Sequence, residues 1–428
     1  MNHVIVLMHL FMVMLLISRY HRLQWKGLDK WQSVILFTLK FLLLYFIFGY
    51  AADHPQPGDV KGYLQDAQLI FEMFRSEPIA TINFIFFGCE IPVGYSHAHF
   101  ALWDETLHLP FFNDTHTVVL FNVLIRFVSM GASGVNLIWF CFIGWMGICM
   151  MTHALFHGKQ GNIMWYLPFL VPQVFIWSGL VLKEPLLILA LGCLINGLVQ
   201  YRRSASGAFK FILFAFVLFL LVKTFVLVLL LPAIIAYFIS LNWKKIPALP
   251  VYIIVCLLFF FFVYLVSLSY PSFDLPQLIY GQQLNMYRFV IYNRANTILD
   301  PIMLAPSWWS LIKRIPESIF YTLLQPLPWK YSFSLAWPLF IENIAVLVLL
   351  AYGIWRQGIK MLSDSVRLFL LFGGLTLLAL AGFVGPIAGT LVRFKVPGLI
   401  LLLLAFVPFT HHHHSASSKR SDDYLSNA

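Results

Sequence analysis

Charged side chains are scarce in this sequence. Asp, Glu, Lys and Arg make up 11% of the 428 residues, whereas soluble domains carry roughly 25%. Hydrophobic residues make up 60%, and the mean hydropathy is +0.82. This composition excludes a soluble globular domain. It predicts an all-α, polytopic transmembrane helical bundle, in which the 42 Phe residues suit lipid-facing surfaces and interface belts.

Cysteine is also scarce, with five residues in the chain. Four of them fall inside apolar runs (Cys141, Cys149, Cys193 and Cys256), which leaves Cys89 alone in a loop. This distribution excludes a disulfide framework and a metal site built on paired cysteines. The four cysteines in the apolar runs are expected to behave as small apolar residues.

Concentrated basic patches are absent, although the net charge is +10. The basic residues form short clusters between apolar runs, such as Arg202–Arg203 and Lys244–Lys245. This pattern orients integral membrane proteins, so we expect membrane lipid as a partner and no nucleic acid. Basic residues follow the first apolar stretch instead of preceding it, at Arg19, Arg22 and Lys26. We therefore expect a retained first helix, not a cleaved signal peptide.

Eleven apolar segments are predicted to cross the membrane. They are residues 2–18, 32–51, 133–155, 163–179, 185–200, 209–222, 225–241, 249–268, 333–354, 367–384 and 396–410. The stretch 209–241 counts as two crossings, because a single helix there would invert everything downstream and place Lys244–Lys245 outside. Residues 1–410 then form one transmembrane domain, and 411–428 form a disordered cytoplasmic tail.

Charge counting gives this domain an orientation. Most Lys and Arg residues fall in segments that the crossings leave on one side, which predicts that this side is cytoplasmic. The cytoplasmic segments contain few acids, and nearly all the remaining Asp and Glu residues lie in two outer segments, 52–132 and 269–332. We expect a multi-pass protein of the bacterial inner (plasma) membrane, with an active site that faces the periplasm or exterior.

The two outer segments have patterns of their own. Apolar residues recur at helical spacing in 62–75 and 117–130, which predicts two helices lying in the membrane interface. The second segment holds Trp308–Trp309 and Trp329, which suit either an interface belt or stacking against carbohydrate. The sequence His97-Ala-His99 would place both rings on one side of an extended strand, a weak pattern for zinc.

The outer face also collects charged residues near predicted helix ends. Burying charge near a membrane is costly, so such residues indicate function. Arg393 and Lys395 are expected to precede the last crossing. The excess of cations over one apposed anion, Glu184, suits an anionic ligand such as a phosphate or diphosphate on a lipid. The full set is Asp53, Asp59, Lys183, Glu184, Lys223, Arg393 and Lys395.

The cations of this set each have a structural alternative. Lys183 and Glu184 would neutralise one another in a turn. Lys223 would extend its amine to the membrane interface, and Arg393 and Lys395 would anchor a helix end there.

The acids have both functional and structural interpretations. Asp59 or Asp53 is a candidate general base, or a ligand of a divalent metal ion such as Mg²⁺ or Mn²⁺. The alternative for Asp59 is to cap the helix that starts at Val60. Glu184 either orients Lys183 or takes part in catalysis. Glu342, inside the ninth crossing, either reaches a charged partner or fills a polar contact between helices.

At these residues the chain resembles the GT-C superfamily of polytopic membrane glycosyltransferases. The bacterial members related to the protein mannosyltransferase and lipid-A-sugar transferase groups are the most similar. The resemblance covers most of residues 30–410. It rests on Gly58-Asp59-x-x-x-Tyr63-x-x-x-Ala67, Ser178-Gly-x-x-x-Lys183-Glu184, the short helix pair broken at Lys223, and Gly389-x-x-x-Arg393-x-Lys395-x-Pro397.

The resemblance implies transfer of a sugar from a polyprenyl-phosphate donor at the outer face, in polysaccharide biosynthesis. The acceptor would be a lipid-linked glycan, a lipid or a protein. Asp59 would then be the base or metal carboxylate. The four cations Lys183, Lys223, Arg393 and Lys395 would hold the donor phosphate.

Two other functions remain open from the residues alone. An O-antigen-type polysaccharide polymerase would use a diphosphate-linked lipid and release polyprenyl diphosphate. A transporter or flippase for lipid-linked sugars would usually have repeated halves, and the sequence contains no such repeat.

Overall fold

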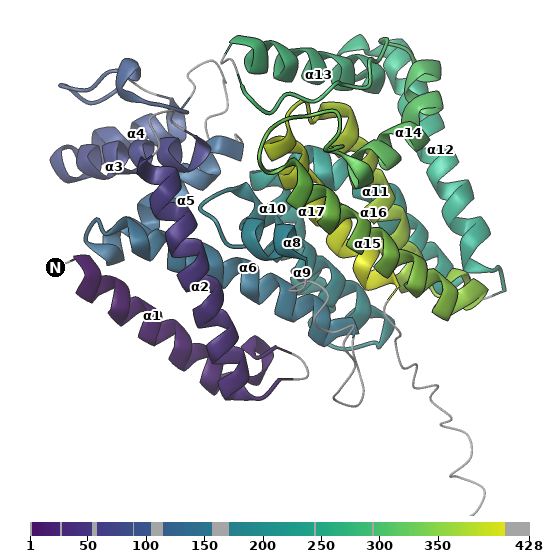
Figure 1. Cartoon of the computed structure of the whole chain (residues 1–428), viewed down its shortest axis with the longest axis horizontal. Coiled ribbons are helices and arrows are strands. Elements are labelled where there is room, and N and C mark those ends of the chain that lie inside the picture. The colour runs from purple at the N-terminus through teal and green to yellow at the C-terminus, as the bar shows by residue number, and fades with distance from the viewer. Residues whose placement is uncertain are drawn as a thin grey trace, which may run out of the picture.

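The computed structural model describes residues 2–25, 28–53, 58–88, 90–103, 114–155, 171–243, 245–292 and 295–406. These residues contain 16 α-helices and no β-strand, which confirms the all-α prediction. A single antiparallel bridge joins Ile298 to Ile387. The helices form a bundle with several shorter helices gathered at one end, where α3, α4 and α13 lie (Figure 1).

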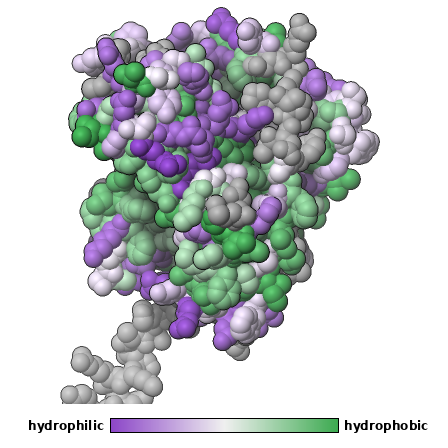
Figure 2. Space-filling view, turned by 90° about the vertical axis from the view of Figure 1, so that its left-hand side faces the viewer, coloured by the Kyte–Doolittle hydropathy of each residue, from purple (hydrophilic) through white to green (hydrophobic). Residues whose placement is uncertain are grey.

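Eight helices of the described part are long and apolar enough to cross a membrane, so the chain is a multi-pass membrane protein. They are α2 (Lys30–Asp53), α6 (Ser133–Leu155), α9 (Lys183–Arg202), α11 (Thr224–Asn242), α12 (Ala248–Ser269), α15 (Ala336–Gln357), α16 (Ser365–Val384) and α17 (Ala388–Ala405). Among the other apolar helices of the described part are α1 (Asn2–Arg19) and α10 (Ala208–Val222). In Figure 2 hydrophilic residues gather mainly at the top, with a largely hydrophobic surface beneath them.

Ten of the eleven predicted crossings coincide with these helices. The fourth, 163–179, lies partly outside the described residues, and its described part contains the six-residue α8 (Pro172–Trp177). The break at Lys223 is confirmed, because α10 ends at Val222 and α11 begins at Thr224. The start predicted for the last crossing is wrong. Helix α17 begins at Ala388, so Arg393 lies inside it.

The centre of the bundle depends on close approach between α6 and α9. A Cβ added at Gly147 would lie 2.6 Å from the carbonyl oxygen of Ile188, and one at Gly192 would lie 2.4 Å from that of Gly147. Small residues let two helix backbones touch in this way, which is typical of packing inside membranes. Most of α9 is buried as a result, including its first acidic residue, Glu184.

The two helices predicted at 62–75 and 117–130 of the first outer segment are confirmed, and their place in the membrane interface stays a prediction. The segment contains α3 (Asp59–Ser76), α4 (Pro78–Phe87) and α5 (Asp114–Ser129), and α3 packs against α5. The carboxylate of Asp66 accepts hydrogen bonds from the backbone N–H groups of residues 101–103, at 2.7–2.9 Å. This carboxylate ties the loop after α4 to α3. The extended strand expected at His97-Ala-His99 is wrong, because these residues form a 3₁₀ turn.

The second outer segment contains two helices that the sequence patterns did not predict, α13 (Leu275–Tyr292) and α14 (Trp308–Leu324). Gln283 of α13 donates hydrogen bonds to the carbonyls of Ile302 and Phe383 at 2.7 and 2.8 Å. Phe383 lies near the end of α16, so this side chain attaches α13 to the end of the bundle where α17 begins. Trp309 and Trp329 are 74% and 70% exposed, which fits an interface belt and stacking against carbohydrate equally well.

Candidate functional site

The non-helical segment between α8 and α9 is buried. Residues 180–182 lead into the helix as an unwound, apolar segment with 5% exposure or less. The carbonyl of Ser178 lies against Gly144, where a Cβ would approach it to 1.7 Å. The amine of Lys40, a fully buried residue of α2, donates to Ser178 Oγ at 2.5 Å. The segment therefore rests on two neighbouring helices, and it places Lys183 and Glu184 in the first turn of α9.

Glu184 is the centre of a charged cluster. Its side chain is 1% exposed, and Oε1 lies 3.2 Å from Arg393 Nε and 3.5 Å from Lys223 Nζ. Lys223 lies at the junction of α10 and α11, and Arg393 lies in the second turn of α17. This buried carboxylate holds its two cationic neighbours strongly, because removing it would leave their positive charges uncompensated. Three helices separated in sequence thus meet at one acid.

Asp59, in the first turn of α3, extends the cluster toward the surface. Its Oδ2 accepts a hydrogen bond from Arg393 Nη1 at 2.5 Å, and its side chain is 42% exposed. Burial raises the pKa of this carboxyl, but the charge and hydrogen bond of Arg393, together with Lys183 and Lys223, outweigh that effect and hold the pKa below its ordinary value. Asp59 is therefore ionised at neutral pH.

Lys183 points away from its neighbour in sequence. Its amine lies 2.7 Å from Asp114 Oδ2 and donates to Thr115 Oγ1 at 3.1 Å, both at the start of α5. The predicted neutralisation of Lys183 by Glu184 in a turn does not occur among the described contacts. Consecutive residues on a helix point about 100° apart, so each finds a different partner.

The balance of charge differs from the sequence count. The ionic cluster, as we call it, contains three cations and three anions: Lys183, Lys223, Arg393, Asp59, Glu184 and Asp114. The expected excess of four cations over one anion is wrong for two reasons. Asp59 and Asp114 pair directly with cations, and Lys395 lies elsewhere. The acids at the edge, Asp59 and Asp114, are 42% and 37% exposed, whereas Glu184 is buried.

Lys395 belongs to a second polar group, although it lies two residues from Arg393. Two positions along a helix correspond to about 200° of rotation, so the two side chains point to opposite sides of α17. The amine of Lys395 donates to Asn343 Oδ1 of α15 at 2.6 Å and is fully buried. The neighbouring Glu342 accepts from the backbone N–H of Gln173 at 2.7 Å. The structure does not bring Lys395 to the other predicted phosphate-binding residues.

Tyr63 is a neighbour of the cluster that the sequence patterns left without a role. It follows Asp59 by one turn of α3 and is 3% exposed. Burial, with the negative charges of Asp59, Glu184 and Asp114, raises its pKa well above the ordinary value. The phenol stays protonated and is a hydrogen-bond donor beside the charges.

The remaining predicted roles have a mixed outcome. The side chain of Asp53 lies outside the described residues. Asp59 does not cap α3 with its side chain, since Gly58 is the N-cap residue. Within the described ranges, no three His, Cys, Asp or Glu side chains approach one another closely enough to hold a metal ion. A divalent ion on Asp59 would therefore take its other ligands from substrate phosphate or water, as Mg²⁺ commonly does.

Sequence reasoning missed Asp114, Thr115 and Lys40. Asp114 is one of many acids in the outer segment 52–132, and nothing in its spacing separates it from the others. Lys40 could have been found, because a lysine inside the predicted crossing 32–51 is by default a residue with a specific partner.

Comparison of this chain with models of known protein families, with curated proteins and with solved structures found no match. The resemblance to the GT-C superfamily therefore stays a prediction that rests on the residues quoted for it.

Proposed function

We propose that the chain is an integral membrane glycosyltransferase of GT-C type. It transfers a sugar from a polyprenyl-phosphate donor to a lipid-linked glycan, a lipid or a protein at the outer face of a bacterial inner membrane. The observation that carries this proposal is the meeting of Asp59, Glu184, Lys223 and Arg393 from four separate helix ends. Charges are costly to bury near a membrane, and a scaffold protein would gain little from collecting them.

The cations of the ionic cluster suit a phosphate group because of how unequally their partners are buried. Glu184 is buried between Lys223 and Arg393 and keeps both in place. Asp59 and Asp114, the second partners, are partly exposed, so an anion arriving from the surface would compete with them for the cations. A phosphate that replaces them would gain charge-assisted hydrogen bonds to Arg393 and Lys183.

Replacement of Asp59 by a phosphate beside Arg393 would also give Asp59 a catalytic role. While Arg393 donates to it, its pKa is low and it is a poor proton acceptor. A phosphate that engages Arg393 would free the carboxylate and raise its pKa, because the nearest positive charge would be neutralised. Asp59 would then take the proton of an acceptor hydroxyl as general base. Binding of the donor and activation of the base are linked through Arg393.

The test is transfer by purified full-length protein in lipid vesicles with a labelled polyprenyl-phosphate sugar. We expect Asp59→Asn to lower the rate by about 10²–10⁴-fold, the usual contribution of a general base. Glu72→Gln is the matched control, since Glu72 lies on α3 outside the cluster, and it should transfer at the normal rate. Undiminished transfer by Asp59→Asn would remove Asp59 from the mechanism. The released lipid should be a monophosphate, whereas a polymerase would release a diphosphate.

A further inference from the structure

The second outer segment is joined to the start of α17. An antiparallel bridge links Ile298 of this segment to Ile387, the residue that precedes the helix. Two backbone hydrogen bonds flank the bridge, one donated by Leu299 N–H to the turn between α16 and α17 at 2.8 Å, the other donated by Ala388 N–H to the outer segment at 2.9 Å. The outer segment therefore holds the chain at the point where α17 begins.

Gln283 of α13 ties the same segment to the end of α16. Its side chain is 6% exposed and donates to the carbonyls of Ile302 and Phe383. Its oxygen accepts a hydrogen bond from Leu304 N–H at 3.2 Å. One amide thus satisfies three backbone groups, two in the outer segment and one in the last turn of α16. This side chain keeps the bridged segment against the helix bundle.

Pro397 lies inside α17 and makes the first turns of that helix depend on contacts at their own end. Proline has no N–H, so the hydrogen bond from position 397 to the carbonyl of Arg393 is missing. Beyond Pro397 the helix is fixed by close packing on α16, where a Cβ added at Gly398 would lie 2.9 Å from the carbonyl oxygen of Gly374. The missing bond loosens the joint between the two parts, so the contacts at the start of α17 help to fix Arg393.

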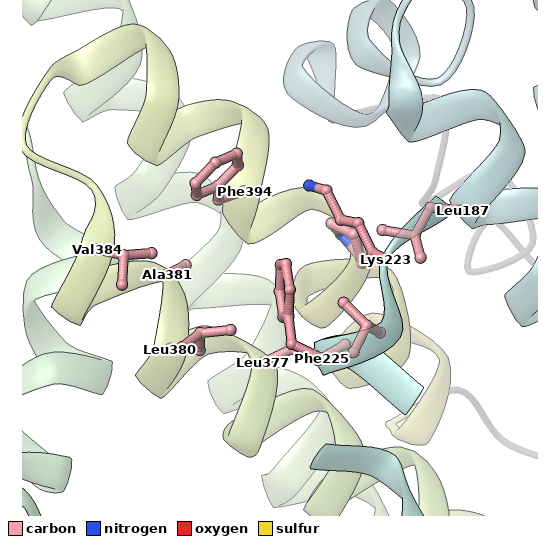
Figure 3. Close-up of a pocket in the computed structure, with 10 residues that line it drawn as sticks. Leu187, Lys223, Phe225, Leu377, Leu380, Ala381, Val384 and Phe394 are labelled. Atoms are coloured by element: carbon pink, nitrogen blue, oxygen red, sulfur yellow. The ribbon is translucent and has the colours of Figure 1, made fainter. Parts of the chain in front are cut away.

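A small apolar cluster provides a second link between the outer segment and this part of α17. Leu304 of the outer segment and Val384 of α16 belong to it, and Phe394 of α17 packs against it. Figure 3 shows Phe394 between Val384 and the amine of Lys223, which lies 4.4 Å from the centre of the ring. The residue next to Arg393 therefore lies between this apolar cluster and the ionic cluster.

We propose that Gln283 is a positioning residue for Arg393. It holds the second outer segment on the turn before α17, and this keeps the guanidinium group beside Asp59 and Glu184. Its own hydrogen bonds among the described residues go to backbone groups outside the ionic cluster. The inference rests on the proposed function only for its effect on transfer.

The test is whether Gln283 changes the strength of the pair formed by Asp59 and Arg393. The free energy of unfolding of the purified full-length protein is measured in mixed micelles at neutral pH for Asp59→Asn, for Gln283→Met and for the double variant. Distant residues that share no partner have additive effects on stability, so a residue with only a structural role would give additive costs. We expect the cost of Asp59→Asn to fall by about half or more in the Gln283→Met protein, because the displaced guanidinium no longer pairs fully with Asp59.

Thr322→Val is the matched control. Thr322 also joins the second outer segment to α16 through a buried side chain, which donates to the carbonyl of Leu378 at 2.9 Å, well before the end of α16. Its substitution should leave the cost of Asp59→Asn unchanged. Ile298→Gly loosens the bridge at a half-buried position and leaves no buried polar side chain unpaired, so it should reduce that cost even where Gln283→Met does not fold.

The proposal is overturned if Gln283→Met and Ile298→Gly are both additive with Asp59→Asn, or if Thr322→Val reduces the cost of Asp59→Asn as much as they do. In the transfer assay Gln283→Met should lower the rate about tenfold or more, because small displacements of a binding group slow a reaction strongly, and Thr322→Val should not.

The two failures can be told apart. Additive stabilities together with transfer by the unmodified protein would refute the positioning role and keep the glycosyltransferase. Coupled stabilities without any transfer by the unmodified protein would keep the positioning role and refute the proposed activity.

Discussion

Replacing Glu184 by Gln tests whether the ionic cluster is held by its buried acid. The substitution preserves shape and removes the charge that faces Lys223 and Arg393 at 3.5 and 3.2 Å. Both cations remain, and Glu184 is 1% exposed, so water cannot replace the lost charge. Breaking a buried ion pair by removing one partner costs about 3–5 kcal/mol. We expect Glu184→Gln to lower the free energy of unfolding by that amount.

The matched control is an exposed pair of the same type. Arg314 and Glu317 lie 2.6 Å apart on α14 with side chains 39% and 53% exposed. Solvent screens this pair, so Glu317→Gln should cost about 1 kcal/mol or less. Both variants are unfolded reversibly in mixed micelles with increasing denaturing detergent, and the signal is the fluorescence of the 13 Trp residues.

A double variant separates charge from packing. Adding Arg393→Gln to Glu184→Gln removes one of the two stranded cations, so part of the lost stability should return, with a coupling of about 0.5–3 kcal/mol. Recovery is incomplete because Lys223 remains. A cost for Glu184→Gln no larger than that for Glu317→Gln, with no coupling to Arg393, would refute the reasoning that a buried acid organises the cluster.

Two further predictions concern single contacts. Ser178→Ala should lower the free energy of unfolding by about 1–3 kcal/mol, because it leaves the buried amine of Lys40 without its acceptor. Lys40→Met removes the charge and keeps the length of the side chain, so it should cost less. Equal costs for the two variants would contradict this prediction. The pKa of Asp59 is lower in the folded protein than its ordinary value of 3.8. The contact between Asp59 and Arg393 therefore contributes stability that is complete above about pH 5. This contribution is lost as the pH falls through the lowered pKa. The stability difference between Asp59→Asn and the unmodified protein should therefore shrink in acid, and a difference independent of pH would contradict the pairing.

Long apolar helices were predictable because their length and hydropathy reflect the membrane directly. The two helices of the second outer segment were not predictable in this way. Pro316 lies inside α14, and a proline at such a position normally indicates the end of a helix. The pattern of α13 mixes aromatic and polar residues without a clean stripe. In the structure, a capping serine, Ser307, and the packing of α14 on α16 favour the helix over the local propensity.

For the candidate site, the sequence predicted the members better than the pairings. Asp59, Lys183, Glu184, Lys223 and Arg393 lie together, as the expected topology required. Which cation meets which acid depends on rotation about each helix axis, and rotation depends on where a helix begins. The eight-residue error in the start of α17 concealed that Arg393 and Lys395 are helical neighbours that point in opposite directions.

Because Arg393 and Lys395 point to opposite sides of α17, insertions and deletions before them should be poorly tolerated. Deleting one residue between Gly389 and Val392 would rotate the remainder of α17 by about 100° relative to its first turn. Arg393 would leave Asp59 and Glu184, and Lys395 would leave Asn343, in the same event. The number of residues between Ile387 and Arg393 therefore fixes both sets of contacts. Conservative substitutions at residues 389–392 should be tolerated where insertions and deletions are not.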